Sequence, residues 1–155
     1  MHVPFVVDDI REMRDADMPN IGEATWQLVY TKSRAERWVE LNLRRQDFFT
    51  LLPLVRSRAG FAPLFPRYVF VGIPAGQSAR PLAGTFGVQY TVHFGDKPAC
   101  VPHDVVAAVK ARMNAHGVVQ LEEAPPLDPL FAQRARDRTR ALLMFAEAGF
   151  RVKSA

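Results

Sequence analysis

Cysteine is almost absent from this 155-residue chain, which contains only Cys100. A single cysteine cannot form an internal disulfide, and it excludes the cysteine-rich zinc sites. The sequence has no apolar run close to the roughly 18 residues that cross a membrane, and its N-terminus lacks a basic-then-apolar signal pattern. These absences predict a reduced, cytoplasmic protein that has no membrane partner.

The motifs of the common enzyme classes are absent as well. The sequence contains no glycine-rich phosphate loop, no dinucleotide fingerprint, no serine nucleophile elbow and no zinc-protease motif. The histidines are scattered without the spacing of metal ligands, at His2, His93, His103 and His116. We therefore expect no enzyme, no catalytic residue, no metal, no cofactor and no small-molecule substrate.

Charge is unevenly distributed along the chain. The net charge is +4, yet residues 1–24 contain six acidic and two basic side chains, so residues 25–155 carry a net charge of +8. A basic body is typical of proteins that bind nucleic acid or an acidic protein surface, and equally of proteins with a merely soluble basic surface. Apolar residues make up 48% of the chain, which is an ordinary globular proportion.

The pattern of apolar residues predicts alternating strands and helices. Strands are expected at 26–31, 48–55, 67–73 and 88–94, with a helix that starts at the capping-box residue Ser33 and another helix over 103–116. Residues 74–87 leave room for a short helix at most. This order predicts an α+β fold with a mostly antiparallel four-stranded sheet and helices on one face.

The stretch "APLFPRYVFVGI", residues 62–73, has two apolar faces. If it is a strand, Val69, Val71 and Ile73 share one face. Tyr68 and Phe70 share the other. The aromatic face is either a surface for a partner or part of the core. In the strand 88–94, Phe94 shares a face with three other apolar residues, so it has the same two interpretations.

The chain divides into four parts. Residues 1–24 are expected to form a leader, 25–117 the folded domain, 118–129 a proline-containing linker and 130–155 a tail. The composition of the tail favours a helix over 130–148, although arginines at every second position from 134 to 140 have the period of a strand.

Three segments together resemble the N-terminal domain of the NusG family, most closely its specialised paralogues of the RfaH type. They are "TWQLVYTKSRAERWVELNLRRQDFFTLLPL", "APLFPRYVFV" and "GTFGVQYTVHFG" with "PACVP", in the family's order and spacing. The resemblance covers about residues 25–117. It implies a transcription elongation or antitermination factor with an antiparallel sheet flanked by helices.

The resemblance also implies where the partners bind. An apolar sheet face would grip the clamp helices of the largest RNA polymerase subunit and keep the enzyme processive, with contacts from Pro66, Tyr68, Phe70 and Phe94. The non-template DNA strand would be a further partner, at Lys32, Arg34, Arg37 and Arg67. The polymerase gate loop would be contacted at Ser78 and Arg80, where this chain departs from the threonine-bearing stretch of RfaH-type proteins.

The tail is the larger departure from the family. Family members end in a small five-stranded KOW barrel, and residues 130–155 are too few to close such a barrel. We interpret the tail as a degenerate KOW remnant, in a chain that acts as a monomer. If the tail is helical, it would cover the aromatic patch of Tyr68, Phe70 and Phe94, as the helical C-terminal domain of RfaH-type proteins does. Alternatively, it would pack on another side of the domain or mediate a dimer.

One alternative function comes from a different class. "RYVFVGI" faintly resembles the first ribonucleoprotein motif of the RRM fold, whose aromatic side chains stack on RNA bases, so the chain could be a free-standing RNA-binding module. An inert truncated paralogue is a third interpretation. The sequence indicates neither a target operon, nor a DNA recognition sequence, nor whether termination is suppressed or enhanced.

Overall fold

The computed structural model of the chain describes residues 21–121 and 128–154. Its helices are α2 (Glu36–Arg44), α3 (His103–Arg112) and α4 (Ala135–Ser154), with short 3₁₀ helices η1 (Ile21–Glu23), η2 (Arg80–Leu82) and η4 (Pro129–Phe131). Its strands are β1 (Ala24–Thr31), β2 (Phe49–Leu51), β3 (Leu54–Ser57), β4 (Gly60–Pro63), β5 (Tyr68–Pro74), β6 (Val88–Thr91), β7 (His93–Phe94), β8 (Lys97–Pro98) and β9 (Val118–Val119).

A four-stranded antiparallel sheet forms the centre of the fold, with the strand order β2-β5-β1-β6. Its two inner strands pair over their whole length, from Ala24 opposite Pro74 to Tyr30 opposite Tyr68. Strands of this length with apolar residues on both faces are expected inside a sheet rather than at its edge. The predicted α+β class and the antiparallel sheet are confirmed.

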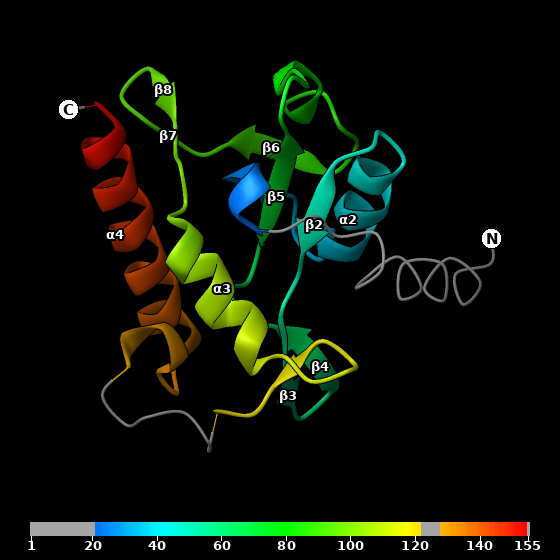
Figure 1. The fold of residues 1–155 in the computed structure, drawn as a ribbon. Coiled ribbons are helices and arrows are strands. Elements are labelled where there is room, and N and C mark those ends of the chain that lie inside the picture. Colours follow the sequence, from blue (N-terminus) through cyan, green and yellow to red (C-terminus); the bar gives the residue numbers. More distant parts are fainter. Residues whose placement is uncertain (1–20, 122–127, 155) are drawn as a thin grey trace.

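Helices cover both faces of this sheet, so the prediction of helices on one face is wrong in this respect (Figure 1). On one face, Val69, Val71 and Ile73 of β5 share a cluster with residues of α2. On the other face, Phe70 shares a larger cluster with residues of α3 and α4. Each apolar face of the strand must be buried, and a single helical layer would leave one of them in water.

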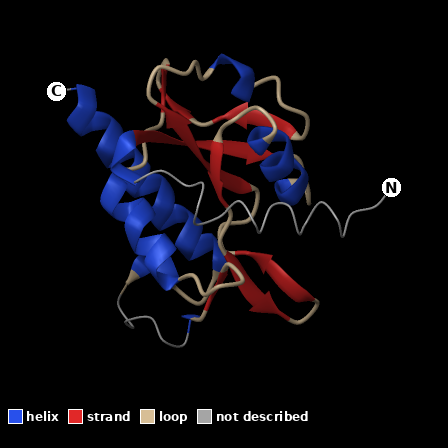
Figure 2. Ribbon diagram, turned by 45° about the vertical axis from the view of Figure 1, so that its right-hand side comes forward, coloured by secondary structure: helices blue, strands red, loops and turns tan. Residues whose placement is uncertain are grey.

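A second, three-stranded sheet extends from the first, in the order β4-β3-β9 (Figure 2). The predicted strand 48–55 is split into β2 and β3, because Leu52 and Pro53 leave the ladder and proline has no N–H to donate. β9 pairs in parallel with β3, so the first residues of the predicted linker are part of the fold. Residues 1–20 of the predicted leader and residues 122–127 of the linker lie outside the described residues.

The start of α2 differs from the prediction. The helix begins at Glu36, and the residue before it, Ala35, makes no side-chain capping bond. Arg34 has a φ of 61°, a left-handed conformation that cannot be part of an α-helix. The capping box expected at Ser33 is therefore not the start of the helix.

A β-bulge changes the faces of the last strand of the main sheet. Tyr30 of β1 pairs with Tyr90, but the next residue, Thr31, pairs with Val88, so Gln89 is the extra residue. The bulge reverses the alternation. Val88 packs in the cluster with α2, whereas Tyr90 stacks on Tyr30 on the opposite side of the sheet. The uniform alternation expected over 88–94 is wrong at this point.

The tail is helical, as its composition indicates. It consists of η4 and α4, and α4 continues beyond the end of the predicted helix at residue 148. Figure 1 shows α4 beside α3, with α2 on the other side of the sheet. Among the helices of the described residues, none has both the length and the apolar character needed to span a membrane.

Gly87 is expected to be required for the contact between α2 and the loop before β6. Its φ is +92°, and a Cβ atom there would lie 2.7 Å from Cγ2 of the buried Val39. The substitution Gly87→Ala should therefore reduce the free energy of unfolding by about 1–3 kcal/mol, measured by urea denaturation. Gly76→Ala is the matched control, since Gly76 has a φ of +83° but no atom within 4 Å of the added carbon. Equal losses in both variants would mean that only the backbone conformation matters.

Candidate functional site

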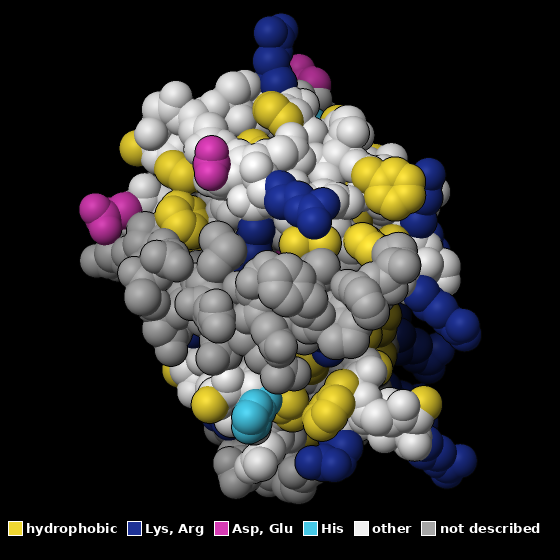
Figure 3. Space-filling model, turned by 90° about the vertical axis from the view of Figure 1, so that its right-hand side faces the viewer, with side chains coloured by type: hydrophobic (Ala, Val, Ile, Leu, Met, Phe, Trp, Pro, Cys, Tyr) yellow, Lys and Arg dark blue, Asp and Glu magenta, His cyan; other side chains and the backbone are white. Residues whose placement is uncertain are grey.

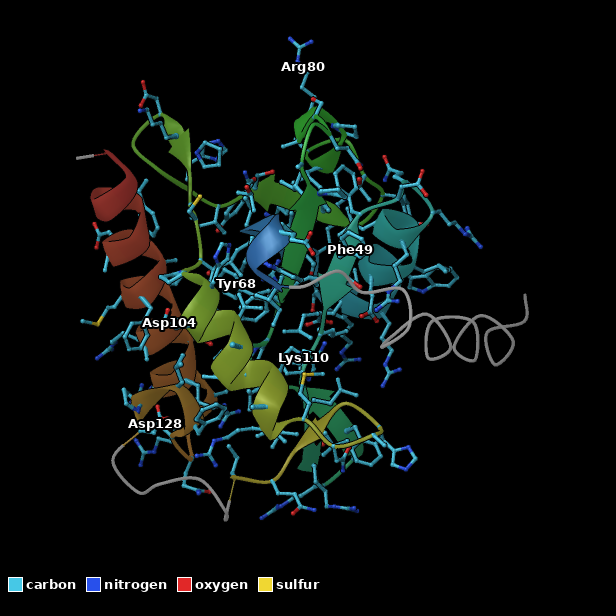
Figure 4. All side chains as sticks on the ribbon, viewed as in Figure 1. Phe49, Tyr68, Arg80, Asp104, Lys110 and Asp128 are labelled. Atoms are coloured by element: carbon cyan, nitrogen blue, oxygen red, sulfur yellow. The ribbon has the colours of Figure 1, made fainter. Side chains whose placement is uncertain are left out.

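The four aromatic and proline residues predicted to bind polymerase have different environments. Phe70 is fully buried, with its ring 5.8 Å from that of Phe65 in an edge-to-face arrangement. Tyr68 and Phe94 are half-buried at the margin of the same apolar cluster, and Pro66 is exposed. Figure 4 labels Tyr68, the first residue of β5. The accessible part of this set is therefore Tyr68, Phe94 and Pro66.

Two further tyrosines belong to this margin, and the sequence interpretation missed both. The ring of Tyr30 lies 5.1 Å from that of Tyr68 and 4.8 Å from that of Tyr90, measured between centroids. Tyr30 lies two residues after Leu28 in β1, so both side chains are on the same face of the strand. This spacing would have placed Tyr30 on that face from the sequence alone. Tyr90 could not be placed in this way because the bulge precedes it. The three rings form one aromatic cluster on the surface of the sheet.

The surroundings of Tyr68 favour its neutral, protonated phenol. Burial raises the pKa of Tyr68, and the neighbouring Tyr90 and Tyr30 raise this pKa further, while Arg67 lowers it. The guanidinium of Arg67 lies 4.4 Å from the ring centroid of Tyr30, as a cation above an aromatic face. The phenol of Tyr68 is therefore held in its uncharged form at this margin.

The tail is packed on the cluster that contains Phe70. Its buried residues in that cluster are Leu130, Phe131, Ala141, Leu142 and Ala146. The guanidinium of Arg112 in α3 lies 4.9 Å from the ring centroid of Phe131, which joins the tail to α3. The aromatic side of the main sheet is thus closed by α3 and by the tail.

Arg138 ties the tail to the segment that precedes β5. Its side chain is only 3% exposed, and its Nε donates a 2.9 Å hydrogen bond to the carbonyl oxygen of Leu64. Its Nη1 donates to the carbonyl oxygens of Ala132 and Gln133, at 2.7 and 2.9 Å. Burial lowers the pKa of Arg138, and among the described residues no carboxylate forms an ion pair with it. The tail is therefore docked through a charged group as well as through apolar contacts.

The predicted nucleic-acid-binding residues separate into two groups. Lys32, Arg34 and Arg37 are exposed at the start of α2. Arg67 is half-buried: its Nε donates to the carbonyl oxygen of Thr31 at 3.0 Å, and its Nη2 donates to Oε1 of Gln89 at 2.8 Å. The first three residues are available to a partner, whereas the guanidinium of Arg67 is bonded within the molecule.

The predicted gate-loop residues lie in the connection between β5 and β6. The backbone N–H of Arg80 donates to Oγ of Ser78 at 3.1 Å, and both residues are exposed. Figure 4 shows Arg80 extending away from the body of the molecule. This connection therefore presents a short polar surface with one positive charge.

A groove of about 1080 Å³ lies between α2, the β3–β4 hairpin and the end of α3. Its one buried carboxylate, Glu40, accepts a hydrogen bond from Thr50 at 3.2 Å and lies 3.8 Å from the guanidinium of Arg44. Burial raises the pKa of Glu40, while Arg44, Thr50 and Arg37 lower it. This carboxylate is engaged in a structural network. Within the described residues no cluster of three acidic, histidine or cysteine side chains could hold a metal.

A protein-family model described as "Transcription termination factor nusG" matches residues 24–110, from the start of β1 into α3. The matched part is more than half of the chain and contains the main sheet, α2 and every predicted site residue. The chain is therefore a transcription factor. It belongs to the NusG family, whose members are transcription factors that bind RNA polymerase rather than enzymes.

Proposed function

We propose that this chain is an elongation or antitermination factor that binds the clamp helices of the largest RNA polymerase subunit. The contact surface is the aromatic side of the main sheet, with Tyr68, Phe94 and Pro66 at its accessible margin and Phe70 behind them. Bound there, the factor keeps the polymerase in a processive state, as a monomer in the cytoplasm.

The observation that carries this proposal is the position of the tail. The aromatic face lies within the family-matched residues 24–110, and it shares its cluster with a tail that lies outside that match. An apolar face of this kind needs a cover in water, and a partner helix can provide the same cover. The tail and the clamp helices therefore compete for one surface.

The exposed cations give the factor a second contact. Lys32, Arg34 and Arg37 lie on one side of the main sheet, at the start of α2, and attract the phosphates of the non-template strand. Arg67 supports this surface through its bonds to Thr31 and Gln89. Ser78 and Arg80 provide the contact with the gate loop.

The alternative of a free-standing RNA-binding module is not favoured. A base can stack only on an accessible ring, and Phe70, at the centre of the strand that resembles the RNA-binding motif, is 0% exposed. Helices cover the centre of both sheet faces, and the accessible rings of Tyr30, Tyr68 and Tyr90 lie at the margin.

The test is the binding of core RNA polymerase to the purified full chain. Tyr68→Ala is expected to weaken this binding by about thirtyfold, because a buried aromatic anchor contributes about 2 kcal/mol or more to an interface. The matched control is Phe61→Ala, which removes a 52% exposed ring from β4 in the other sheet. Circular dichroism would check the fold of both variants. Unchanged polymerase binding by a folded Tyr68→Ala variant would exclude this face as the site.

A further inference from the structure

Two large aromatic side chains are exposed near the α2 side of the main sheet. Trp38 of α2 is 42% exposed and Phe86, in the connection before β6, is 75% exposed. Tryptophan and phenylalanine have large apolar surfaces, so exposing them to water loses a large favourable free energy of burial. Neither residue belongs to the proposed polymerase contact or to the cations assigned above.

Hydrogen bonds hold the connection that carries Phe86, at the residue before Phe86 and at the residue after it. Thr85 Oγ1 donates to the carbonyl oxygen of Pro81 at 2.9 Å and accepts a bond of the same length from Gln46 Nε2. The carbonyl oxygen of Gly87 accepts a 2.8 Å bond from the N–H of Lys32. Phe86 is thus presented to solvent by a fixed backbone rather than by a loose loop.

The connection that carries Phe86 contacts the helix that carries Trp38. Nδ2 of Asn42 donates to the carbonyl oxygen of Phe86 at 3.4 Å, and Trp38 lies one helical turn before Asn42. A Cβ atom built on Gly87 would lie 2.7 Å from Cγ2 of Val39, the residue next to Trp38. Both residues therefore lie where the connection crosses α2.

Positive charge surrounds this pair. Lys32, Arg34, Arg37 and Arg45 are exposed on α2 and on the residues directly before and after it. The glutamates of the helix do not cancel this charge at the surface, because Glu36 and Glu40 are buried and accept hydrogen bonds from Arg67 N and Thr50. Figure 3 views the molecule from the side that carries α2 in Figure 1, and shows Lys and Arg side chains beside hydrophobic ones along one edge.

We propose that Trp38 and Phe86 form a stacking platform for unpaired bases of a single-stranded nucleic acid. The phosphates of that strand lie against Lys32, Arg34 and Arg37. Exposed aromatic rings within a cationic surface are the combination that binds single strands with little sequence preference, because every base has a face that can stack. The inference rests on the contact with the non-template strand proposed above, and it adds the residues that bind the bases.

The test uses the intrinsic fluorescence of the full chain, without polymerase. The chain has two tryptophans, and Trp26 is only 1% exposed, so quenching by an added oligonucleotide reports on Trp38. A 12-nucleotide oligothymidine and a 12-nucleotide oligouridine are titrated separately, to distinguish DNA from RNA, beside a duplex of the same length. Single strands are expected to quench the emission in a saturable manner. The duplex is expected to cause no quenching, because its bases are already stacked on one another. In Trp38→Phe the quenching should disappear.

Two sets of variants separate stacking from charge. Phe86→Ala is expected to weaken binding of the single strand about tenfold with an unchanged dependence on salt. Reversal of charge at Lys32, Arg34 and Arg37 should instead flatten the dependence on salt, by about one unit per lost phosphate contact. Phe61→Ala, which removes an exposed ring on another sheet, is expected to have no effect.

Three results would overturn the inference. They are unchanged Trp38 emission with both single strands, equal quenching by the duplex, and an equal loss of affinity in Phe61→Ala. A fourth would reassign the rings to a protein contact: weaker polymerase binding in Phe86→Ala with oligonucleotide binding unchanged. The proposed polymerase contact is tested independently by Tyr68→Ala, which should leave the fluorescence titration unaltered.

Discussion

Replacing Leu142 with aspartate is expected to raise the affinity of the chain for RNA polymerase by about tenfold or more. Leu142 is fully buried in the cluster that joins α4 to Phe70. An ionised carboxylate at that position lacks a partner and costs several kcal/mol to bury, so the tail leaves the sheet. Because the apparent dissociation constant is the intrinsic one divided by the fraction of open chains, binding tightens as the tail is released.

The matched control for this result is Met144→Asp. It places the same charge on the same helix, at a residue that is 65% exposed, and should leave the affinity unchanged. Binding is measured by competition for core polymerase, with circular dichroism and gel filtration to check the fold and the monomeric state. If Leu142→Asp is folded and monomeric but binds polymerase no better than the natural chain, the tail does not mask the site.

Phe70→Ala is expected to remove about 3–5 kcal/mol from the free energy of unfolding. The ring is 0% exposed and lies on a central strand, so its loss leaves a cavity between the sheet and its helical cover. Chemical denaturation followed by circular dichroism measures the change. The exposed ring of Phe61 serves again as the comparison, since Phe61→Ala should change stability by no more than about 0.5 kcal/mol.

A loss below about 1 kcal/mol in Phe70→Ala would show that this ring contributes little to the core. In that case Phe70 would be available to bind polymerase directly. If the large loss is observed, the contribution of Phe70 to polymerase binding must be measured with Phe70→Leu, which keeps most of the buried volume.

The main sheet could be predicted from the sequence because its inner strands are regular. Alternation from Tyr68 to Ile73 identified an aliphatic and an aromatic face, and the two faces belong to separate clusters in the structure. The order of strands and helices then indicated an antiparallel α+β fold. The alternation could not indicate which segment covers the aromatic face. α4 is far away along the chain, and its apolar stripe does not show which surface it packs against.

The candidate site was predicted in part. Tyr68, Phe94 and the cations at the start of α2 could be proposed in advance because they lie in the segments that resemble the family. Burial of Phe70 and the internal bonds of Arg67 depend on distant residues, and no local pattern encodes them. The exposure of Phe86 depends on a backbone held by Gln46 and Lys32, which lie about 40 to 55 residues earlier in the sequence.

The buried guanidinium of Arg138 bears on how reversible the docking of the tail is. Dehydrating a cation without a carboxylate beside it costs several kcal/mol, and its three bonds to carbonyl oxygens recover only part of that loss. The docked and undocked tail are therefore closer in free energy than a purely apolar contact of the same area would make them. If the tail masks the polymerase site as proposed, a partner of moderate affinity can open the chain, and the chain closes again when that partner dissociates. An aliphatic residue in place of Arg138 would remove this dehydration cost, but it would also remove the hydrogen bonds to the carbonyl oxygens of Leu64, Ala132 and Gln133.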